Sequence, residues 1–122
     1  MWKDACAVAL IHKELCSGAF EPAKGNVLLV GDAAGLILPI MFEGIGTALK
    51  SGILAADSVI AGMDKGGDAS SIYLKGLQPI RECISSLVGR QEMLAAASER
   101  GPDILADSLV AAYLETLIIQ EE

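Results

Sequence analysis

Hydrophobic residues along this chain occur in two patterns: one short continuous run, and several longer stretches with helical spacing. The short run, Val27–Val30, contains only Val and Leu, follows the turn signal Gly25-Asn26 and ends at Gly31. Four consecutive apolar residues of this kind are typical of a buried strand, although a buried helical turn can have the same length. The flanking glycines favour the strand.

Helices are predicted on both sides of this run. The stretch Trp2–Cys16 contains an apolar segment with three alanines, which favours a helix that stops before Gly18. Residues Asp32–Phe42 are expected to form a loop with one helical turn at most, broken by Pro39. A second helix is predicted from Glu43 to Met63.

The C-terminal half is predicted to be helical throughout. From Ser71 onward apolar residues recur at helical spacing, with a bend expected at Pro79. Gly101-Pro102-Asp103 interrupts this pattern, so one helix ends there and another begins, either led by the proline or capped by the aspartate. The last helix is predicted over Ile104–Ile119. One of its faces carries five residues: Leu105, Leu109, Ala112, Tyr113 and Leu117.

Four small residues stand four positions apart along the predicted helix 43–63: Gly44, Ala48, Gly52 and Ala56. They leave a shallow groove, into which another backbone can come close. A glycine inside a helix, such as Gly52, costs roughly 1 kcal/mol relative to alanine. A packing or ligand contact would explain that cost.

Together these elements describe a mostly α chain with one remnant strand. A lone strand cannot satisfy its own backbone N–H and C=O groups, so we expect its sheet partners to lie outside this sequence. We therefore interpret residues 1–122 as a single partial domain, in which a strand–loop–helix unit over 26–63 is followed by a helical part over 71–119.

Composition narrows the class of function. A net charge of −7 with scattered Lys and Arg argues against nucleic-acid binding. The 52% hydrophobic content indicates either an alanine-rich helical core or apolar surface for another domain, chain or membrane. No apolar run reaches about 18 residues, so no spanning helix is expected, and the N-terminus makes a poor signal peptide. We expect a cytoplasmic protein, with a peripheral membrane position as the alternative.

Three cysteines without paired spacing, Cys6, Cys16 and Cys83, indicate free thiols rather than a disulfide framework. No His/Cys cluster suggests a metal. Cys83 lies in an apolar helical pattern and is expected in the core. The single histidine, His12, is expected on the surface or on a helix face, and Arg81 is expected to face solvent.

The strongest candidate chemistry lies between the strand and the helix that follows it. Asp32 comes directly after the strand, where α/β folds place ligands, and its carboxylate can accept hydrogen bonds from ligand hydroxyls. Ala33 and Gly35 have little or no side chain, so their N–H groups can approach an anion. The helix start Glu43–Gly46 carries N–H donors and partial positive charge. Taken alone, Asp32 is better explained as a turn or capping carboxylate. Glu43 could contact substrate or flavin, but its favourable place at a helix start explains it equally well.

The string VLLVGDAAG, a proline four residues on, and then EGIGTALKSGILAA closely resemble the second flavin-binding motif of the geranylgeranyl reductase family. That family belongs to the larger group of FAD-dependent oxidoreductases that includes p-hydroxybenzoate hydroxylase. The resemblance covers about Asn26 to Ile60 and implies the C-terminal part of an α/β, Rossmann-like FAD-binding fold. In such enzymes the flavin passes hydride or electrons to an unsaturated, often isoprenoid, substrate.

The resemblance implies eight cofactor-binding residues: Gly31, Asp32, Ala33, Gly35, Pro39, Gly44, Ile45 and Gly46. Asp32 would hydrogen-bond a ribityl hydroxyl of FAD, and the backbone around Ala33 and Gly35 would lie near the pyrophosphate or ribityl chain. Pro39 would shape the loop beside the isoalloxazine ring. Donors at the helix start would face the pyrimidine edge of the ring and favour the reduced flavin. No catalytic acid or base and no metal ligand is implied.

Two departures from the family pattern matter. Met41 and Phe42 stand where family members usually carry a small pair such as Thr-Gly, and their bulk would narrow the ring pocket or change substrate choice. The fingerprint Gly-x-Gly-x-x-Gly, with which the resembled enzymes bind the ADP half of FAD, does not occur in the chain. We therefore expect an incomplete FAD site that is inactive in isolation. It would need an N-terminal dinucleotide-binding segment, a partner chain or self-association.

Two other hypotheses remain open. The chain could be a helical module that no longer binds FAD and acts through a partner docked in the small-residue groove. Alternatively, it could be a fragment of a flavin monooxygenase or an electron-transfer flavoprotein oxidoreductase, because the motif does not define the substrate.

Overall fold

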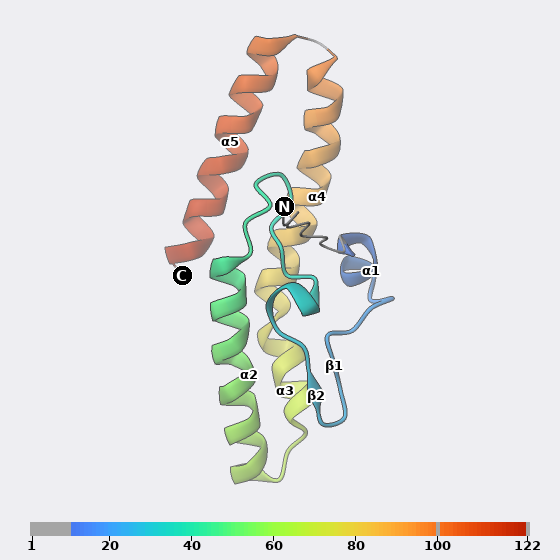
Figure 1. Cartoon of the computed structure of the whole chain (residues 1–122), viewed down its shortest axis with the longest axis vertical. Coiled ribbons are helices and arrows are strands. Elements are labelled where there is room, and N and C mark those ends of the chain that lie inside the picture. The colour runs from blue at the N-terminus through green and yellow to red at the C-terminus, as the bar shows by residue number, and fades with distance from the viewer. Residues whose placement is uncertain (1–10, 100, 122) are drawn as a thin grey trace, which may run out of the picture.

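The computed structural model describes residues 11–99 and 101–121, most of which are helical (Figure 1). The elements in chain order are α1 (His12–Ser17), β1 (Ala23–Lys24), β2 (Val27–Leu28), the 3₁₀ helix η1 (Gly31–Ala34), α2 (Ile45–Lys65), α3 (Ala69–Gly76), α4 (Gln78–Ser98) and α5 (Pro102–Glu121). The predicted mostly helical class is confirmed.

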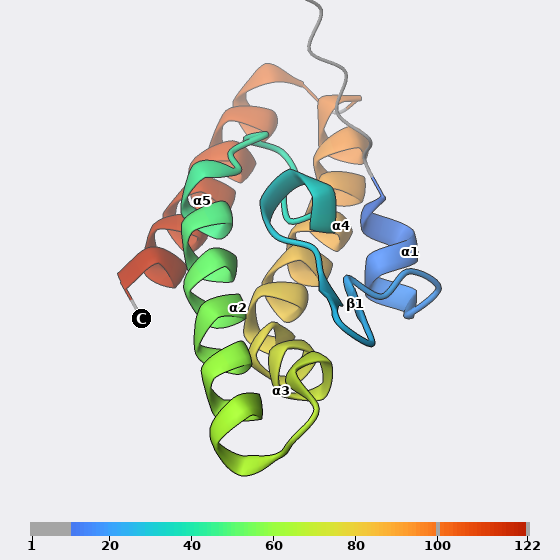
Figure 2. The ribbon, with the colours of Figure 1, turned by 60° about the horizontal axis from the view of Figure 1, so that its bottom comes forward.

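The helix α4 runs through the middle of the molecule, as Figures 1 and 2 show from two directions. It contacts α1 on one side, while α5 folds back along it on another. The helix α2 packs against α3 and against η1. The loop that follows η1 therefore lies between α1, α2 and α4, and it joins the two parts of the predicted flavin motif, which lie in η1 and at the start of α2.

The prediction of a lone, buried strand over Val27–Val30 is wrong. Only Val27 and Leu28 are in a strand, and they pair antiparallel with Lys24 and Ala23. Gly25 turns the chain back at a φ of 56°, a left-handed conformation that suits glycine. The two-residue strands satisfy each other's backbone groups. Among the described residues nothing buries Val27, which is 59% exposed.

The helix predicted over 2–16 is helical where the structure describes it. Residues 2–10 lie outside the described part of the chain, and α1 ends at Gly18, whose φ is 78°. The expectation that Arg81 faces solvent is wrong. Its guanidinium is partly buried and donates to the backbone oxygen of Leu15 at 2.7 Å, which ties α1 to α4.

The predicted bend at Pro79 is a break between α3 and α4. A proline has no N–H, so residue 79 cannot donate to the carbonyl one turn earlier at Lys75, and the regular helix is interrupted at Leu77. Gly101, with a φ of 133°, separates α4 from α5, and Pro102 is the first residue of α5. Of the two predicted starts, the proline-led one is therefore correct.

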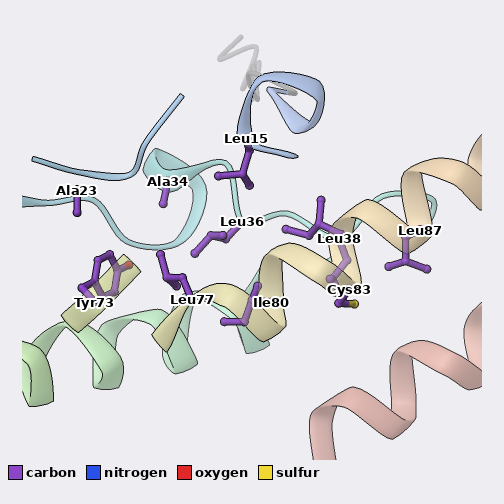
Figure 3. Close-up of a cluster of buried hydrophobic side chains, with 11 residues drawn as sticks. Leu15, Ala23, Ala34, Leu36, Leu38, Tyr73, Leu77, Ile80, Cys83 and Leu87 are labelled. Atoms are coloured by element: carbon purple, nitrogen blue, oxygen red, sulfur yellow. The ribbon is translucent and has the colours of Figure 1, made fainter. Parts of the chain in front are cut away.

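The hydrophobic core lies where the loop after η1 meets α3 and α4 (Figure 3). Leu36 and Leu38 of the loop lie above Leu77 and Ile80, and each fully buried leucine contributes roughly 1.5–3 kcal/mol. Cys83 is buried here, as predicted. The core also includes Leu15, Ala23, Ala34, Tyr73, Ile84 and Leu87.

Tyr73 connects this core to the polypeptide before η1. Its hydroxyl donates to the backbone oxygen of Leu29 at 2.7 Å. Burial raises the pKa of the Tyr73 phenol, and a hydrogen bond with Ser51 acts in the opposite direction. The phenol therefore stays protonated and keeps its role as a donor to Leu29.

One helix in the described part of the chain, Ile45–Asp64 within α2, is long and apolar enough to cross a membrane by length and composition alone. Such a test is weak evidence, because single helices of soluble proteins also pass it. Here α2 contacts α3 and η1 along one side, and only 17% of the apolar stretch is buried.

Candidate functional site

The helix η1 packs directly on α2 through a glycine. Gly31 has a φ of 56°, and a Cβ built on it would lie only 2.9 Å from the Cβ of Ala48. Its N–H donates to the Ser51 hydroxyl at 3.0 Å. The predicted groove thus receives a backbone at Ala48, whereas nothing among the described residues lies within 4 Å of a Cβ built on Gly52.

Asp32 lies against the N-terminus of α2. A Cβ built on Gly44 would lie 2.9 Å from Asp32 Oδ1, so the carboxylate occupies this place only because residue 44 is a glycine. Asp32 is exposed, and within the described chain its carboxylate accepts no hydrogen bond. It is therefore free to accept from a ligand.

The turn after Asp32 is closed by a backbone hydrogen bond within it. Gly35 has a φ of 70°, and its N–H donates to the Asp32 backbone oxygen at 3.0 Å. A Cβ on Gly35 would lie 2.6 Å from the Ile11 side chain, so α1 covers this turn from behind. Ala33 is exposed at the turn. In this arrangement the Gly35 N–H is not available to a ligand, and the cofactor contact assigned to it stays a prediction.

The next four residues, Leu36 to Pro39, are buried and held at two carbonyl groups. The Thr47 hydroxyl donates to the Leu36 oxygen from α2, and His12 Nε2 lies 2.7 Å from the Ile37 oxygen on the opposite side. His12 is only 8% exposed, so of the two predicted places the surface is wrong and the helix face, here a buried one, is right. The cause is the burial of α1 against the loop, which periodicity alone did not indicate.

Backbone strain is concentrated between Pro39 and the start of α2. Ile40 has a φ of 74° and Phe42 a φ of 51°, although neither is a glycine. Conformations of this kind cost of order 1–3 kcal/mol each and cluster at functional sites. The Leu38 N–H closes the turn by donating to the Glu43 oxygen at 2.8 Å.

The two bulky residues that depart from the family pattern lie within this turn, with exposed side chains. Met41 and Phe42 are exposed, the latter by 61%. Pro39, by contrast, is fully buried beneath them. The bulk of Met41 and Phe42 thus projects outward from the described residues.

The helix α2 begins with a carboxylate of its own. Glu43 Oε1 accepts the Gly46 N–H at 2.9 Å, while Glu43 Oε2 is buried without a hydrogen-bond partner in the described part of the chain. The contact assigned to Gly46 would require this cap to open. Gly44 is the N-cap and Ile45, which is 76% exposed, is the first helical residue.

We call Asp32, Glu43, Gly44 and Ile45 the corner site, because η1 and the start of α2 meet there. The fold brings together four of the predicted residues at this corner, namely Asp32, Gly44, Ile45 and Gly46, with Gly31 at its base. Gly35 and Pro39 lie buried in the loop behind it. Two carboxylates at the positive end of α2 suit a ligand that donates hydrogen bonds.

Two clefts among the described residues lie away from the corner site. One of about 570 Å³ lies between α2 and the α3–α4 break, and includes Lys50, Leu54 and Pro79. The other, of about 430 Å³, lies beside the hairpin turn and Asp68. No group of three or more possible metal ligands occurs in the searched part of the chain, 11–99 and 101–121.

Three residues that support the site were missed by sequence reasoning: His12, Thr47 and Ser51. Thr47 and Ser51 are one helical turn apart. Ser51 accepts from Gly31 in η1, and Thr47 donates to Leu36 in the loop after η1. The signal for them was the pair of hydroxyls on the same side of the helix as the small residues. No comparable signal indicated His12, whose partner is 25 residues away.

Sequence comparison connects this chain to reductases of geranylgeranyl lipids. It is 44% identical over 77 residues to digeranylgeranylglycerophospholipid reductase 3 of Methanosphaera stadtmanae. The aligned residues are 63% of this chain but 18% of the relative, so the chain corresponds to a small part of that protein. The predicted resemblance to the geranylgeranyl reductase family is thereby confirmed. No family model and no solved structure matches the chain.

Proposed function

We propose that this chain contributes the ribityl and isoalloxazine side of an FAD site in an oxidoreductase that resembles geranylgeranyl reductases. The Asp32 carboxylate carries the proposal, because it lies at the start of α2 beside Gly44 and accepts no hydrogen bond within the described chain. A free carboxylate suits hydroxyl groups, which can donate to it, better than phosphates, which repel it. The ribityl chain of FAD offers such hydroxyls.

The residues of the corner site fit this part of FAD in two respects. Because Gly44 has no side chain, the Asp32 carboxylate can lie in the space that a Cβ would fill. The N–H groups of Gly44 and Ile45 belong to the helix start, where no intrahelical acceptor exists. FAD, when bound, supplies the redox chemistry, and these residues would hold and orient it.

Glu43 changes what the helix start can contribute. Its Oε1 already engages one first-turn N–H, and its Oε2 is buried and has no partner among the described residues. A second carboxylate beside Asp32 weakens the attraction of the helix start for an anion. We therefore assign to Asp32 and Glu43 the recognition of donor groups on the cofactor, and only a minor part in stabilising its negative charge.

The other half of the site must come from a different segment, because this sequence has no ADP-binding fingerprint. The outward face of α2 provides a surface for it. That face carries five exposed apolar residues: Ile45, Leu49, Ile53, Ile60 and Met63. Clusters of exposed apolar side chains mark contact surfaces, and we infer that a dinucleotide-binding segment covers this one.

The same apolar face supports a second candidate function. A helical module without FAD could dock a partner, or a second copy of itself, through these residues of α2. In that case the corner site would have only a structural role.

The name of the relative describes the reduction of a digeranylgeranylglycerophospholipid. We extend this to the complete protein to which our chain would belong, and infer an unsaturated isoprenoid chain as its substrate. Such a lipid resides in a membrane. We therefore infer that the complete protein works at a membrane surface.

A visible absorption spectrum of the purified chain with added FAD tests the proposal. The spectrum is recorded for the chain alone and for the chain mixed with the N-terminal part of the relative. Protein-bound flavin is expected in the mixture. Leu49→Lys should abolish it by disrupting the apolar face, whereas Ser85→Lys, on an exposed position of α4, should not. Free flavin in both samples would favour the second function.

A further inference from the structure

The single histidine of the chain is buried where two segments meet. His12 begins α1, and its Nε2 lies 2.7 Å from the backbone oxygen of Ile37, 25 residues along the chain. Since a carbonyl oxygen can only accept, Nε2 must carry the proton of this hydrogen bond. A buried donor would not give up such a bond without cost, so the contact constrains the loop.

The residue that His12 holds adjoins the corner site. The Cγ1 atom of Ile37 lies 3.5 Å from the position of a Cβ on Gly44, the same position that Asp32 Oδ1 approaches to 2.9 Å. The next N–H along the chain, that of Leu38, donates to the Glu43 oxygen. Ile37 therefore contacts the place where Asp32 meets Gly44, and the residue after it is bonded to Glu43.

A second hydrogen bond makes the arrangement specific. From α2, the Thr47 hydroxyl donates to the oxygen of Leu36, the residue before Ile37. The loop is thus held at adjacent carbonyl groups, by α1 on one side and by α2 on the other. Without the bond from His12, the Ile37 carbonyl would lose its only side-chain partner among the described residues, and the strained turn at Ile40 and Phe42 could relax.

We propose that His12 is a positioning residue for the corner site, acting through the Ile37 carbonyl to hold Gly44 and Glu43 in register with Asp32. The role in flavin binding rests on the proposed function, while the role in holding the loop does not. His12 touches no ligand in this account. It sets the place of the residues that would.

Amide hydrogen exchange of the whole chain tests the proposal directly. The exchange rate of the Leu38 N–H reports the bond to Glu43 that closes the turn, and the exchange rate of the Leu87 N–H in α4 reports the core. His12→Ala should raise the Leu38 rate roughly tenfold relative to Leu87, as expected for the loss of one buried hydrogen bond. His12→Gln, whose amide can replace Nε2 as donor, should restore most of the protection. His12→Asn is too short to reach and should not.

Arg81→Gln provides the matched control, because it removes the other tether of α1 but leaves Ile37 alone. This substitution should change the amide exchange rates of Leu38 and Leu87 by similar factors. The proposal would be overturned if the ratio of the Leu38 to the Leu87 exchange rate stayed unchanged in His12→Ala and His12→Asn. It would also be overturned if Arg81→Gln changed that ratio as much as His12→Ala does.

FAD titration of the same variants separates the two claims. Where the wild-type protein binds FAD with its dinucleotide-binding partner, His12→Asn should weaken binding several-fold and His12→Gln should not. Absence of flavin binding in every sample would contradict the proposed function, and the exchange ratio would still decide the role of His12.

Discussion

Individual glycines define the corner site through contacts as well as through backbone conformation. Gly31 needs a left-handed φ of 56° and leaves only 2.9 Å between a built Cβ and Ala48. Gly52, on the same helix face as Ala48, has open space around it. The two glycines look alike in the sequence, so their different surroundings offer a controlled comparison.

Gly31→Ala should lower the free energy of unfolding by about 2–3 kcal/mol. A left-handed alanine costs about 1–2 kcal/mol, and the short contact with Ala48 adds strain. Gly52→Ala should instead raise stability by about 0.5–1 kcal/mol, because it replaces a helical glycine without a clash. Urea denaturation measures both. Similar effects of the two substitutions would show that η1 does not pack on α2 as described.

At the scale of elements, α3 is anchored by a capping aspartate. Asp68 accepts the N–H groups of Ser70 and Ser71 and the Ser71 hydroxyl, at 3.1, 3.3 and 2.6 Å. These bonds, the one from the Ser71 hydroxyl foremost, lower the pKa of Asp68 below 3.8. The Ser70 hydroxyl also donates to Gly25, so the cap lies beside the hairpin turn.

The lowered pKa of Asp68 predicts a pH-dependent stability. A carboxylate whose pKa is lower in the folded state stabilises the fold at pH values above 3.8, and this contribution is lost as the pH falls through the folded value. Asp68→Ala should therefore lower the Tm at neutral pH, and the difference from wild type should disappear in acid. Asp64→Ala, in the last turn of α2, serves as control. A difference that persisted well below pH 3.8 would contradict this account of the cap.

The order of the elements followed from the sequence, because helices and turns are local. The helical spacing after Ser71 and the breaks at Pro79 and Gly101 correspond to α3, α4 and α5. The pairing of Ala23 with Leu28 did not follow, since Ala and Lys carry no strand signal and the pair forms only because a turn brings them together. Likewise, the segment after η1 reads as a loop, and its burial depends on α1 and α4.

The candidate site was predictable in part for the same reason. Asp32, Gly44 and Ile45 were expected at one place because a strand end and a helix start were expected to meet. Asp32 does lie against Gly44 at the start of α2, but it comes from the 3₁₀ helix η1 and not from the end of a strand. The capping of Gly46 by Glu43 depends on a side-chain rotamer, and the bond from His12 to Ile37 depends on tertiary packing. Neither is encoded in local spacing.

At the scale of the whole molecule, the proposed half of the flavin site lies beside an exposed apolar surface. The corner site adjoins the exposed apolar face of α2, so a segment that covers the face would also close the site. The small share of the relative that this chain matches agrees with such an arrangement. This is the physical basis for expecting FAD binding with a partner segment rather than by the chain alone.

The affinity for FAD of two matched aspartate variants tests the central claim most directly. In the presence of the dinucleotide-binding partner, Asp32→Ala should raise the Kd for FAD about 10- to 100-fold, the effect of losing a hydrogen bond to a charged group. Asp57→Ala, also exposed but on α2 away from the corner, should leave it unchanged. Equal Kd values for Asp32→Ala and the wild type would contradict the assignment of Asp32, and with it the proposed flavin site.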